Sequence, residues 1–216
     1  MMINKNAGCK LSPFFYFFII GTIVCPLMFS GCGLPKKQAR IVHYYTLSYD
    51  APKASGIKKA PAVIRIKPPI ARPPYDSIKI VYSTGPYQQA FYRYHMWVAF
   101  PADMIFNMIE RDFRQSGIAD AVITGPSGIA PTHSLEIVIN KFYEKDGKNS
   151  WSAILSLTTR LVKENPAGPS KLIYEKTYEA TKELGRKNPA GLARAMSQCL
   201  SKISGRMIKD VYTNLN

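Results

Sequence analysis

The residues that could support catalysis or hold a metal ion are few, and their spacing does not form a site. The histidines are His43, His95 and His133, and only His133 has an acid nearby, Glu136. Three positions along a strand put these two side chains on opposite faces. The glycine-rich stretch 125–128 lacks the lysine of a phosphate-binding loop, so a turn is the better interpretation. The sequence therefore predicts no metal, no cofactor and no catalytic residue.

Two acids, Glu110 and Asp112, lie close together in a stretch with helical spacing of its apolar residues. Side chains at positions i and i+2 of a helix point apart. We therefore expect both acids to lie on a solvated helix face and not to form an acid–base pair. Any component that uses ATP is expected to be another chain.

Cys32 is the cysteine whose surroundings suggest a reaction. Lys5 and Lys10 form a basic head, residues 14–29 are almost wholly apolar, and the small residues 30–31 directly precede Cys32. This order is typical of a secretory signal peptide. The apolar run is shorter than the about 20 residues that a membrane-spanning helix needs. A transmembrane anchor, or an incidental cysteine after an ordinary signal peptide, is the weaker interpretation.

The stretch Phe29-Ser30-Gly31-Cys32 resembles the lipobox of bacterial lipoproteins. The resemblance implies that the Cys32 thiol accepts a diacylglycerol, that the peptidase cuts before Cys32, and that the new amine carries a third acyl chain. Two acyl chains already anchor a protein stably. Phe29 departs from the leucine that the lipobox prefers at that position. Under the usual sorting rule, Gly33 implies the outer membrane, because an aspartate there would hold a lipoprotein in the inner membrane.

The chain is strongly basic, with 29 Lys and Arg against 14 Asp and Glu and a formal net charge of +15. Such an excess is also found in nucleic-acid-binding proteins. An outer-envelope location and the scattered basic residues argue against that partner. A positive surface beside anionic lipid headgroups and an ordinary solvated surface both remain open. The mature chain would keep Cys32 and Cys199, so lipidation of Cys32 leaves no intramolecular disulfide, and Cys199 is expected in the core.

The expected boundaries are a signal peptide at 1–31, a lipidated tether at 32–40 and a single domain at 41–216. Strand-like segments are predicted at 41–49, 62–68, 77–83, 90–100, 118–125, 134–144, 152–164 and 171–181, the last three as antiparallel hairpins. The proline-rich stretch 68–76 is excluded from a central strand. Helices are predicted from Pro101 to Ser116 and from Pro189 onward. The fold class is therefore α+β, a mostly antiparallel sheet with two amphipathic helices packed on it.

The segment 90–100 is unusually aromatic. Strict alternation along a strand would put Tyr92 and Tyr94 on one face and Trp97 on the other. Half of such a strand usually lies in the core, and the other half would then expose aromatic side chains as a binding surface does. We therefore take Tyr92, Tyr94 and Trp97 as a candidate surface for a partner or a lipid.

The order of motifs after the lipobox resembles the ABC-type transport auxiliary lipoproteins of the PqiC/YmbA type. The motifs are Tyr44-Tyr45-Thr46-Leu47, Pro68-Pro69, Arg72-Pro73-Pro74-Tyr75, Ile80-Val81-Tyr82, and an aromatic strand with Trp97 before a helix. The stretch at Arg72 to Tyr75 departs from the Asp-Arg-Pro-Gln-Ile-Val-like run typical of the family. Arg72 and Tyr75 join the candidate partner surface.

The resemblance implies a non-enzymatic lipoprotein on the periplasmic face of the outer membrane in a Gram-negative envelope. Its implied partners are the membrane, through acyl chains, an MCE-domain protein, and an ABC permease and ATPase of one system that moves lipids or other hydrophobic compounds. Direct lipid binding and a homo-oligomer are left open. Two alternatives also stay open: a structural or assembly lipoprotein that braces partner proteins, and an exported enzyme whose site the sequence does not reveal.

Overall fold

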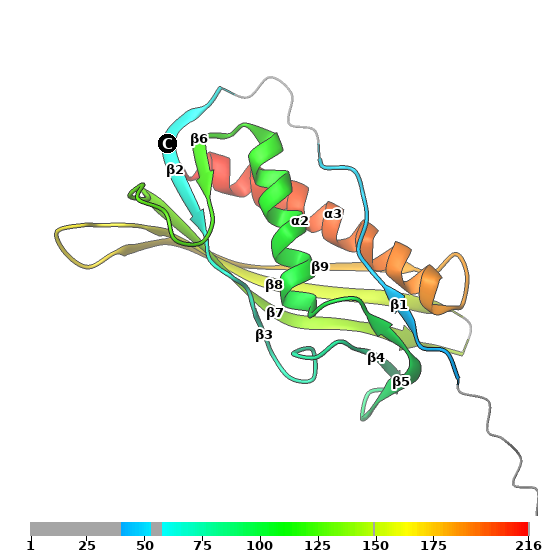
Figure 1. Cartoon of the computed structure of the whole chain (residues 1–216). Helices are drawn as coiled ribbons and strands as arrows, with labels where there is room; N and C mark the ends of the chain where they lie inside the picture. Colours follow the sequence, from blue (N-terminus) through cyan, green and yellow to red (C-terminus); the bar gives the residue numbers. More distant parts are fainter. Residues whose placement is uncertain (1–39, 53–57, 149, 216) are drawn as a thin grey trace, which may run out of the picture. The chain divides into compact units, whose positions relative to one another are not determined.

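The computed structural model describes residues 40–52, 58–148 and 150–215. The predicted signal peptide 1–31, the lipidation site Cys32, the sorting residue Gly33 and most of the predicted tether lie outside the described residues. Residues Ile41–Asn216 form one compact unit. The account of the fold below concerns this unit (Figure 1).

Three long strands form one side of the sheet, with β9 at its edge: β7 (His133–Asp146), β8 (Trp151–Lys163) and β9 (Lys171–Glu183). They pair as two consecutive antiparallel hairpins, which confirms the prediction for this part of the chain. Alternate residues of β8 point to the core, and Leu155, Leu157 and Leu161 have no exposed surface. The alternation follows from the two-residue period of a strand, so one face of this sheet is buried along its length.

The other edge of β7 is covered by three short strands placed one after another. They are β2 (Ala60–Ile66), β3 (Ile70–Ala71) and β4 (Lys79–Gly85), and all three run parallel to β7. The break after β2 coincides with Pro68 and Pro69, which have no N–H to donate to a sheet. The short β3 is therefore a brief pairing inside the proline-rich stretch that we had excluded from a central strand.

The sheet divides into two arms beyond these short strands. β6 (Ala119–Ile123) pairs in parallel with β2. At the other end β5 (Gln88–Trp97) pairs antiparallel with β4, and β1 (His43–Tyr45) pairs in parallel with β5. The α+β class is confirmed, but the sheet is mixed: its long ladders are antiparallel and its short ones are largely parallel. The order of strands in the sequence does not specify which partner lies across each edge.

Two helices lie on the same face of the sheet (Figure 1). α2 (Pro101–Ser116) ends at Gly117, whose φ of 63° is the left-handed conformation that glycine adopts without strain. α3 (Pro189–Thr213) begins at Asn188, whose side-chain oxygen accepts the Gly191 N–H at 2.8 Å. Both ends of α2 and the start of α3 agree with the sequence prediction. Neither is long and apolar enough to cross a membrane.

One apolar stripe of α3 lies in the core. Its six members are buried: Leu192, Met196, Leu200, Ile203, Met207 and Val211. Cys199 lies beside them at 2% exposure, and burial raises the pKa of its thiol to about 11. This thiol is therefore a core side chain that stays protonated near neutral pH, as its position in the helix suggested.

The prediction for Asp112 is wrong. Its side chain is fully buried between the two helices and the segment that follows β1. The Tyr49 hydroxyl and the Ser204 hydroxyl donate to Oδ2 at 2.8 and 2.6 Å, and the Arg111 guanidinium donates to Oδ1 at 2.7 Å. Position in the helix alone suggested solvent, but the chain after β1 covers this part of α2 and supplies the partners. We call this group the Asp112 cluster.

Candidate functional site

The aromatic strand β5 is not regular, and its irregularity decides where its side chains point. Lys79 of β4 pairs with Met96, whereas Val81 pairs with Phe91. Two steps along β4 thus correspond to five steps along β5, so β5 carries three extra residues in this interval. A bulge of this kind bends the strand and shifts the alternation of its side chains.

The bulge brings Tyr92 and Trp97 to the same face of the sheet. The Trp97 ring packs on Phe142 with ring centroids 5.1 Å apart, and the Tyr92 hydroxyl donates to Glu144 at 2.8 Å. Phe142 and Glu144 are two positions apart on β7 and therefore share a face. The odd spacing of Tyr92 and Trp97 had predicted opposite faces, and the three extra residues reverse that result.

Glu144 lies under this face with no exposed surface and only one partner. Its Oε1 accepts the Tyr92 hydroxyl, whereas Oε2 has no hydrogen-bond partner. Burial raises the pKa of this carboxyl, because the charged form loses its water, and the negative charge of Asp146 raises it further. Burial and the hydrogen bond to Glu144 in turn raise the pKa of Tyr92. The Tyr92 hydroxyl therefore keeps its proton near neutral pH.

Aromatic and imidazole rings surround Glu144 and Tyr92. The rings of Tyr82 and Tyr92 meet edge to face with centroids 5.1 Å apart. His95 stacks on His43 at 5.5 Å, and the Tyr45 hydroxyl lies 2.9 Å from Nδ1 of His95. The Tyr92 hydroxyl and the Tyr45 hydroxyl are thus both partnered within this layer, whereas Oε2 of Glu144 is not. The arrangement resembles a packed half-buried layer more than an acid–base site aimed at a substrate.

The opposite face of the same arm exposes apolar side chains. Tyr44 and Lys79 both pair with Met96, so these three residues share a face. Phe91 pairs with Val81, which is itself buried at 2% exposure, and the Phe91 ring lies under the Lys79 ammonium at 5.2 Å. The Val98 N–H donates to the Tyr45 carbonyl at 2.8 Å, so the strand geometry continues one residue further. We call Tyr44, Phe91, Met96 and Val98 the aromatic surface.

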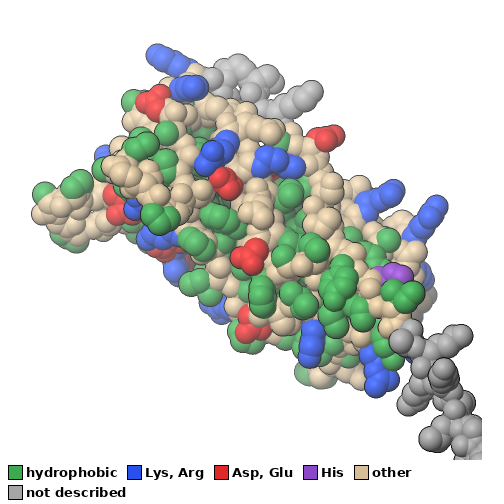
Figure 2. Space-filling view, viewed as in Figure 1, with side chains coloured by type: hydrophobic (Ala, Val, Ile, Leu, Met, Phe, Trp, Pro, Cys, Tyr) green, Lys and Arg blue, Asp and Glu red, His purple; other side chains and the backbone are tan. Residues whose placement is uncertain are grey.

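These side chains are substantially exposed: Tyr44 58%, Phe91 46% and Val98 57%, with Met96 half-buried. Further exposed apolar side chains, Tyr87 and Phe100, lie at the two ends of β5. Figure 2 shows hydrophobic side chains gathered around the end of the domain that holds β1, β4 and β5. Exposed apolar side chains that gather in this way usually mark a contact surface.

The predicted site residues fall into three groups. Trp97 and Tyr75 are core residues at 1% and 5% exposure, which corrects their assignment to a partner surface. Trp97 fills the space beside Phe142, and Tyr75 stacks on Tyr143. Their size and apolar character suited a core as well as a binding surface, and the burial decides between the two.

The remaining predicted residues keep some exposure. Tyr92 and Tyr94 are half-buried, Tyr92 toward Glu144 and Tyr94 beneath the Arg93 guanidinium at 5.8 Å. The Arg72 side chain is exposed, while its backbone N–H donates to Ile139 at 3.1 Å. The structure brings Tyr92 and Tyr94 together on β5 but does not bring Arg72 into a shared cavity with them. Cys32 and Gly33 lie outside the described residues.

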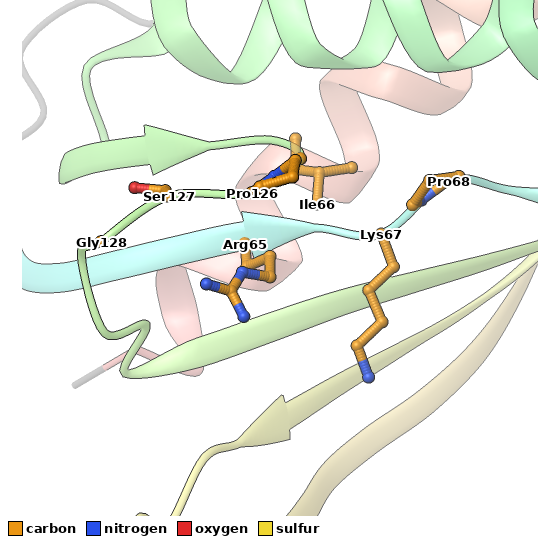
Figure 3. Close-up of a pocket in the computed structure, with 8 residues that line it drawn as sticks. Arg65, Ile66, Lys67, Pro68, Pro126, Ser127 and Gly128 are labelled. Atoms are coloured by element: carbon orange, nitrogen blue, oxygen red, sulfur yellow. The ribbon is translucent and has the colours of Figure 1, made fainter.

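An open pocket of about 620 Å³ lies between β2 and the loop at 125–128 (Figure 3). Arg65 and Lys67 line it, but their side chains point away from Pro126 of that loop (Figure 3). Lys67 is also paired with Glu136 at 2.8 Å. The cations therefore do not converge on a point where an anion could sit, and the turn interpretation of this loop holds.

The described residues contain no group of three His, Cys, Asp or Glu side chains that could hold a metal ion. His133, predicted to face away from Glu136, is buried, and its Nδ1 lies 2.9 Å from the Thr132 hydroxyl. Burial lowers the pKa of this imidazole. Its surroundings are those of a core histidine.

Sequence reasoning missed the hydrogen bond between Tyr92 and Glu144. It also missed the change in side-chain alternation along β5. One signal was present: β5 spans 10 residues and its partner β4 only 7. A bulge places extra residues on one of two paired strands, so unequal lengths are compatible with one. The predicted segments 77–83 and 90–100 already differed in length, but the position of the bulge could not be deduced from them.

A family model described as "ABC-type transport auxiliary lipoprotein component" matches residues 45–207. Comparison with curated proteins finds no significant match. Among solved structures, a Xanthomonas campestris protein superimposes with a TM-score of 0.71 at 18% identity, covering 82% of this chain and 96% of that one. A Chlamydia trachomatis hypothetical protein gives 0.51 at 10% identity, covering 72% and 98%. At these identities the structures establish a shared fold alone.

Proposed function

The chain belongs to the ABC-type transport auxiliary lipoprotein family, and from this premise we propose that it is a non-enzymatic part of an envelope transport system for lipids or other hydrophobic compounds. The observation that carries the proposal is the family match over residues 45–207, which covers nearly the whole described domain. The domain also offers an exposed apolar surface and, among its described residues, no metal cluster.

Acylation of Cys32 is the proposed attachment to the membrane. The basic head, the apolar run and the small residues before Cys32 support it, and Gly33 supports the periplasmic face of the outer membrane. The acyl chains would hold the domain at the bilayer, since each buried methylene contributes about 0.8 kcal/mol. The signal peptide 1–31 and tether 32–40 are parts of the same proposal.

The proposed partners are an MCE-domain protein and the ABC permease and ATPase of one system. The stretch 125–128 lacks a phosphate-binding lysine, which agrees with ATP hydrolysis by another chain. In this arrangement the MCE-domain protein forms the conduit, and the domain at 41–216 contacts it at the outer membrane. A structural lipoprotein that braces partners would share the anchor but would not affect transport.

The anchor is tested by Cys32→Ala in the full-length chain. We expect mass spectrometry of the mature wild-type N-terminus to show a triacylated Cys32 and the variant to lose it. Lys202→Ala, an exposed change on α3, serves as the control and should leave acylation unchanged. An unmodified N-terminus created by another cut site would contradict the lipoprotein assignment of Cys32.

The transport role is tested separately in cells. We expect wild-type protein to co-purify with an MCE-domain protein after cross-linking, and its deletion to slow the exchange of labelled phospholipid between the two membranes. Restored exchange on expression of wild type, but not of Cys32→Ala, would support an anchored transport component. Unchanged exchange in the deletion strain would favour the bracing role instead.

A further inference from the structure

The aromatic surface differs from the rest of the outer sheet face, the face opposite the helices. Along β7, β8 and β9 that face carries cross-strand ion pairs, Lys141 with Glu179 and Arg160 with Glu175. The strands β1, β4 and β5 instead contain the cations Lys79 and Arg93 and no acid. The outer sheet face is thus polar, with paired charges, on β7, β8 and β9. On β1, β4 and β5 it is apolar, with cations that no acid of these strands matches.

The position of the aromatic surface along the chain is also distinctive. Ile41, the first residue of the domain, is 76% exposed, and Tyr44 follows three residues later. Nine steps of chain join Cys32 to Ile41, and a fully extended chain covers about 30 Å in that number of steps. If Cys32 carries the acyl chains, as the proposed function requires, β1 is held within that distance of the bilayer.

Tyrosine and other amphipathic side chains are enriched where lipid headgroups meet the acyl region. Basic side chains near an anionic bilayer are attracted to its surface. Lys79 and Arg93 are exposed on the strands that carry the surface, and Lys36 and Lys37 lie in the connecting stretch. Apolar side chains flanked by unmatched cations have the composition of an interfacial membrane contact.

The area of the surface favours a bilayer over a protein as its occupant. A stable protein complex buries about 800 Å² on each partner. An aromatic side chain can bury only roughly 150–250 Å², Met96 and Val98 are not aromatic, and the four members of the aromatic surface are about half exposed. A bilayer needs no such area here, because the acyl chains already supply the affinity.

We propose that the aromatic surface is a membrane-contact surface, which lies in the headgroup region of an anionic bilayer and fixes the orientation of the lipid-anchored domain. The proposal rests on the acylation of Cys32 in the proposed function. The contact keeps the sheet end with β1, β4 and β5 at the membrane and directs the charged part of the sheet away from it.

The test uses the full-length acylated protein in vesicles of phosphatidylethanolamine and phosphatidylglycerol. Tyr44→Trp places a fluorescent reporter on the aromatic surface, and Thr177→Trp places one on the exposed charged part of the same face. Lipids brominated near the headgroup end of their chains should quench the Tyr44→Trp signal several-fold more than the Thr177→Trp signal, after subtraction of wild-type fluorescence. Replacing phosphatidylglycerol by a zwitterionic lipid should reduce the difference.

Equal quenching of both reporters, or quenching of neither, in acylated protein would overturn this inference and leave the proposed function standing. A protein without acyl chains on Cys32 would overturn the proposed anchor and this inference together. Mass spectrometry of the same vesicle sample separates the two cases. The double variant Phe91→Asp/Val98→Asp should abolish the excess quenching of Tyr44→Trp while acylation remains, and unchanged quenching in it would also overturn the inference.

Discussion

Two carboxylates of this domain, Asp112 and Glu144, have no exposed surface, yet their surroundings differ in almost every respect. Asp112 accepts hydrogen bonds from two hydroxyls and from the Arg111 guanidinium, and each of its oxygens has a partner. Glu144 accepts one hydrogen bond, from Tyr92, and its second oxygen has none. The first lies between the two helices and the second at the aromatic end of the sheet.

The difference shows how the two ends of the domain are stabilised. Charged side chains remain stable inside a protein only where donors and an opposite charge replace the lost water. The Asp112 cluster meets that condition and joins α2, α3 and the segment after β1. At the aromatic end Glu144 forms no ion pair with any described residue, and burial raises the pKa of its carboxyl. The buried charge at the helix end is therefore stabilised by its partners. At the aromatic end the desolvation of Glu144 is not offset in this way.

The largest effect is expected from Asp112→Ala. Removing one partner of a buried ion pair costs about 3 kcal/mol or more, because the remaining groups are left unsatisfied. For a domain of this size that corresponds to a fall in Tm of roughly 6–12 °C, measurable by thermal unfolding with circular dichroism. Asn107→Ala, an exposed change on the same helix, is the matched control. Equal Tm values for the two variants would show that the Asp112 cluster does not stabilise the domain.

Glu144→Gln tests the other member of the comparison. Because the folded-state pKa of Glu144 is raised, the folded protein holds its proton more tightly than the unfolded chain. The contribution of this carboxyl to stability is thus fully present below its ordinary pKa of 4.5 and is lost as the pH rises through the folded pKa. We expect Glu144→Gln to raise the Tm slightly at pH 7 and to lose this advantage as the pH approaches 4.5.

The measurement for Glu144→Gln is the Tm as a function of pH for wild type and variant. A difference that grows toward acid pH would reverse the sign and contradict a raised pKa. Glu136→Gln provides a control, because Glu136 is half exposed and paired with Lys67. Its pH profile should follow that of the wild type far more closely.

The smallest effect is expected from Glu179→Ala, at an exposed acid on the outer sheet face. Its oxygen lies 3.2 Å from the Lys141 ammonium, and about half of each side chain is exposed. Exposed ion pairs of this kind contribute about 0.2–1 kcal/mol. The Tm should fall by no more than a few degrees, and less at high salt. A fall in Tm equal to that of Asp112→Ala would mean that burial does not determine how much a carboxylate contributes to stability.

The helices and long hairpins could be predicted because their signals are local. Pro101 and Gly117 mark the ends of α2, and Asn188 marks the start of α3. The alternation in β7 and β8 likewise places Leu135 and Leu155 in the core. Each of these features depends on residues within a few positions of one another, so a single sequence contains what is needed to find them.

The candidate site could be predicted only in its composition. The aromatic segment was recognised, but the orientation of Tyr92 and Trp97 depends on three extra residues in β5 and on a partner strand distant in the sequence. The burial of Asp112 depends likewise on Tyr49 and Ser204, which lie 63 and 92 positions away. Side-chain direction and burial that arise from such long-range contacts leave no periodic signal in the local sequence.

The Asp112 cluster also determines how the domain would carry a load applied at its N-terminal end. A pull on Ile41 first meets β1, whose ladder with β5 is only three residues long and would give way early. Beyond it the load reaches Ser48, whose N–H donates to Ser197 on α3, and Tyr49, which is bonded to Asp112 on α2. Tension that enters through the short strand β1 is thereby distributed over both helices. The hydrogen bonds of Ser48 and Tyr49 are then the contacts that resist it.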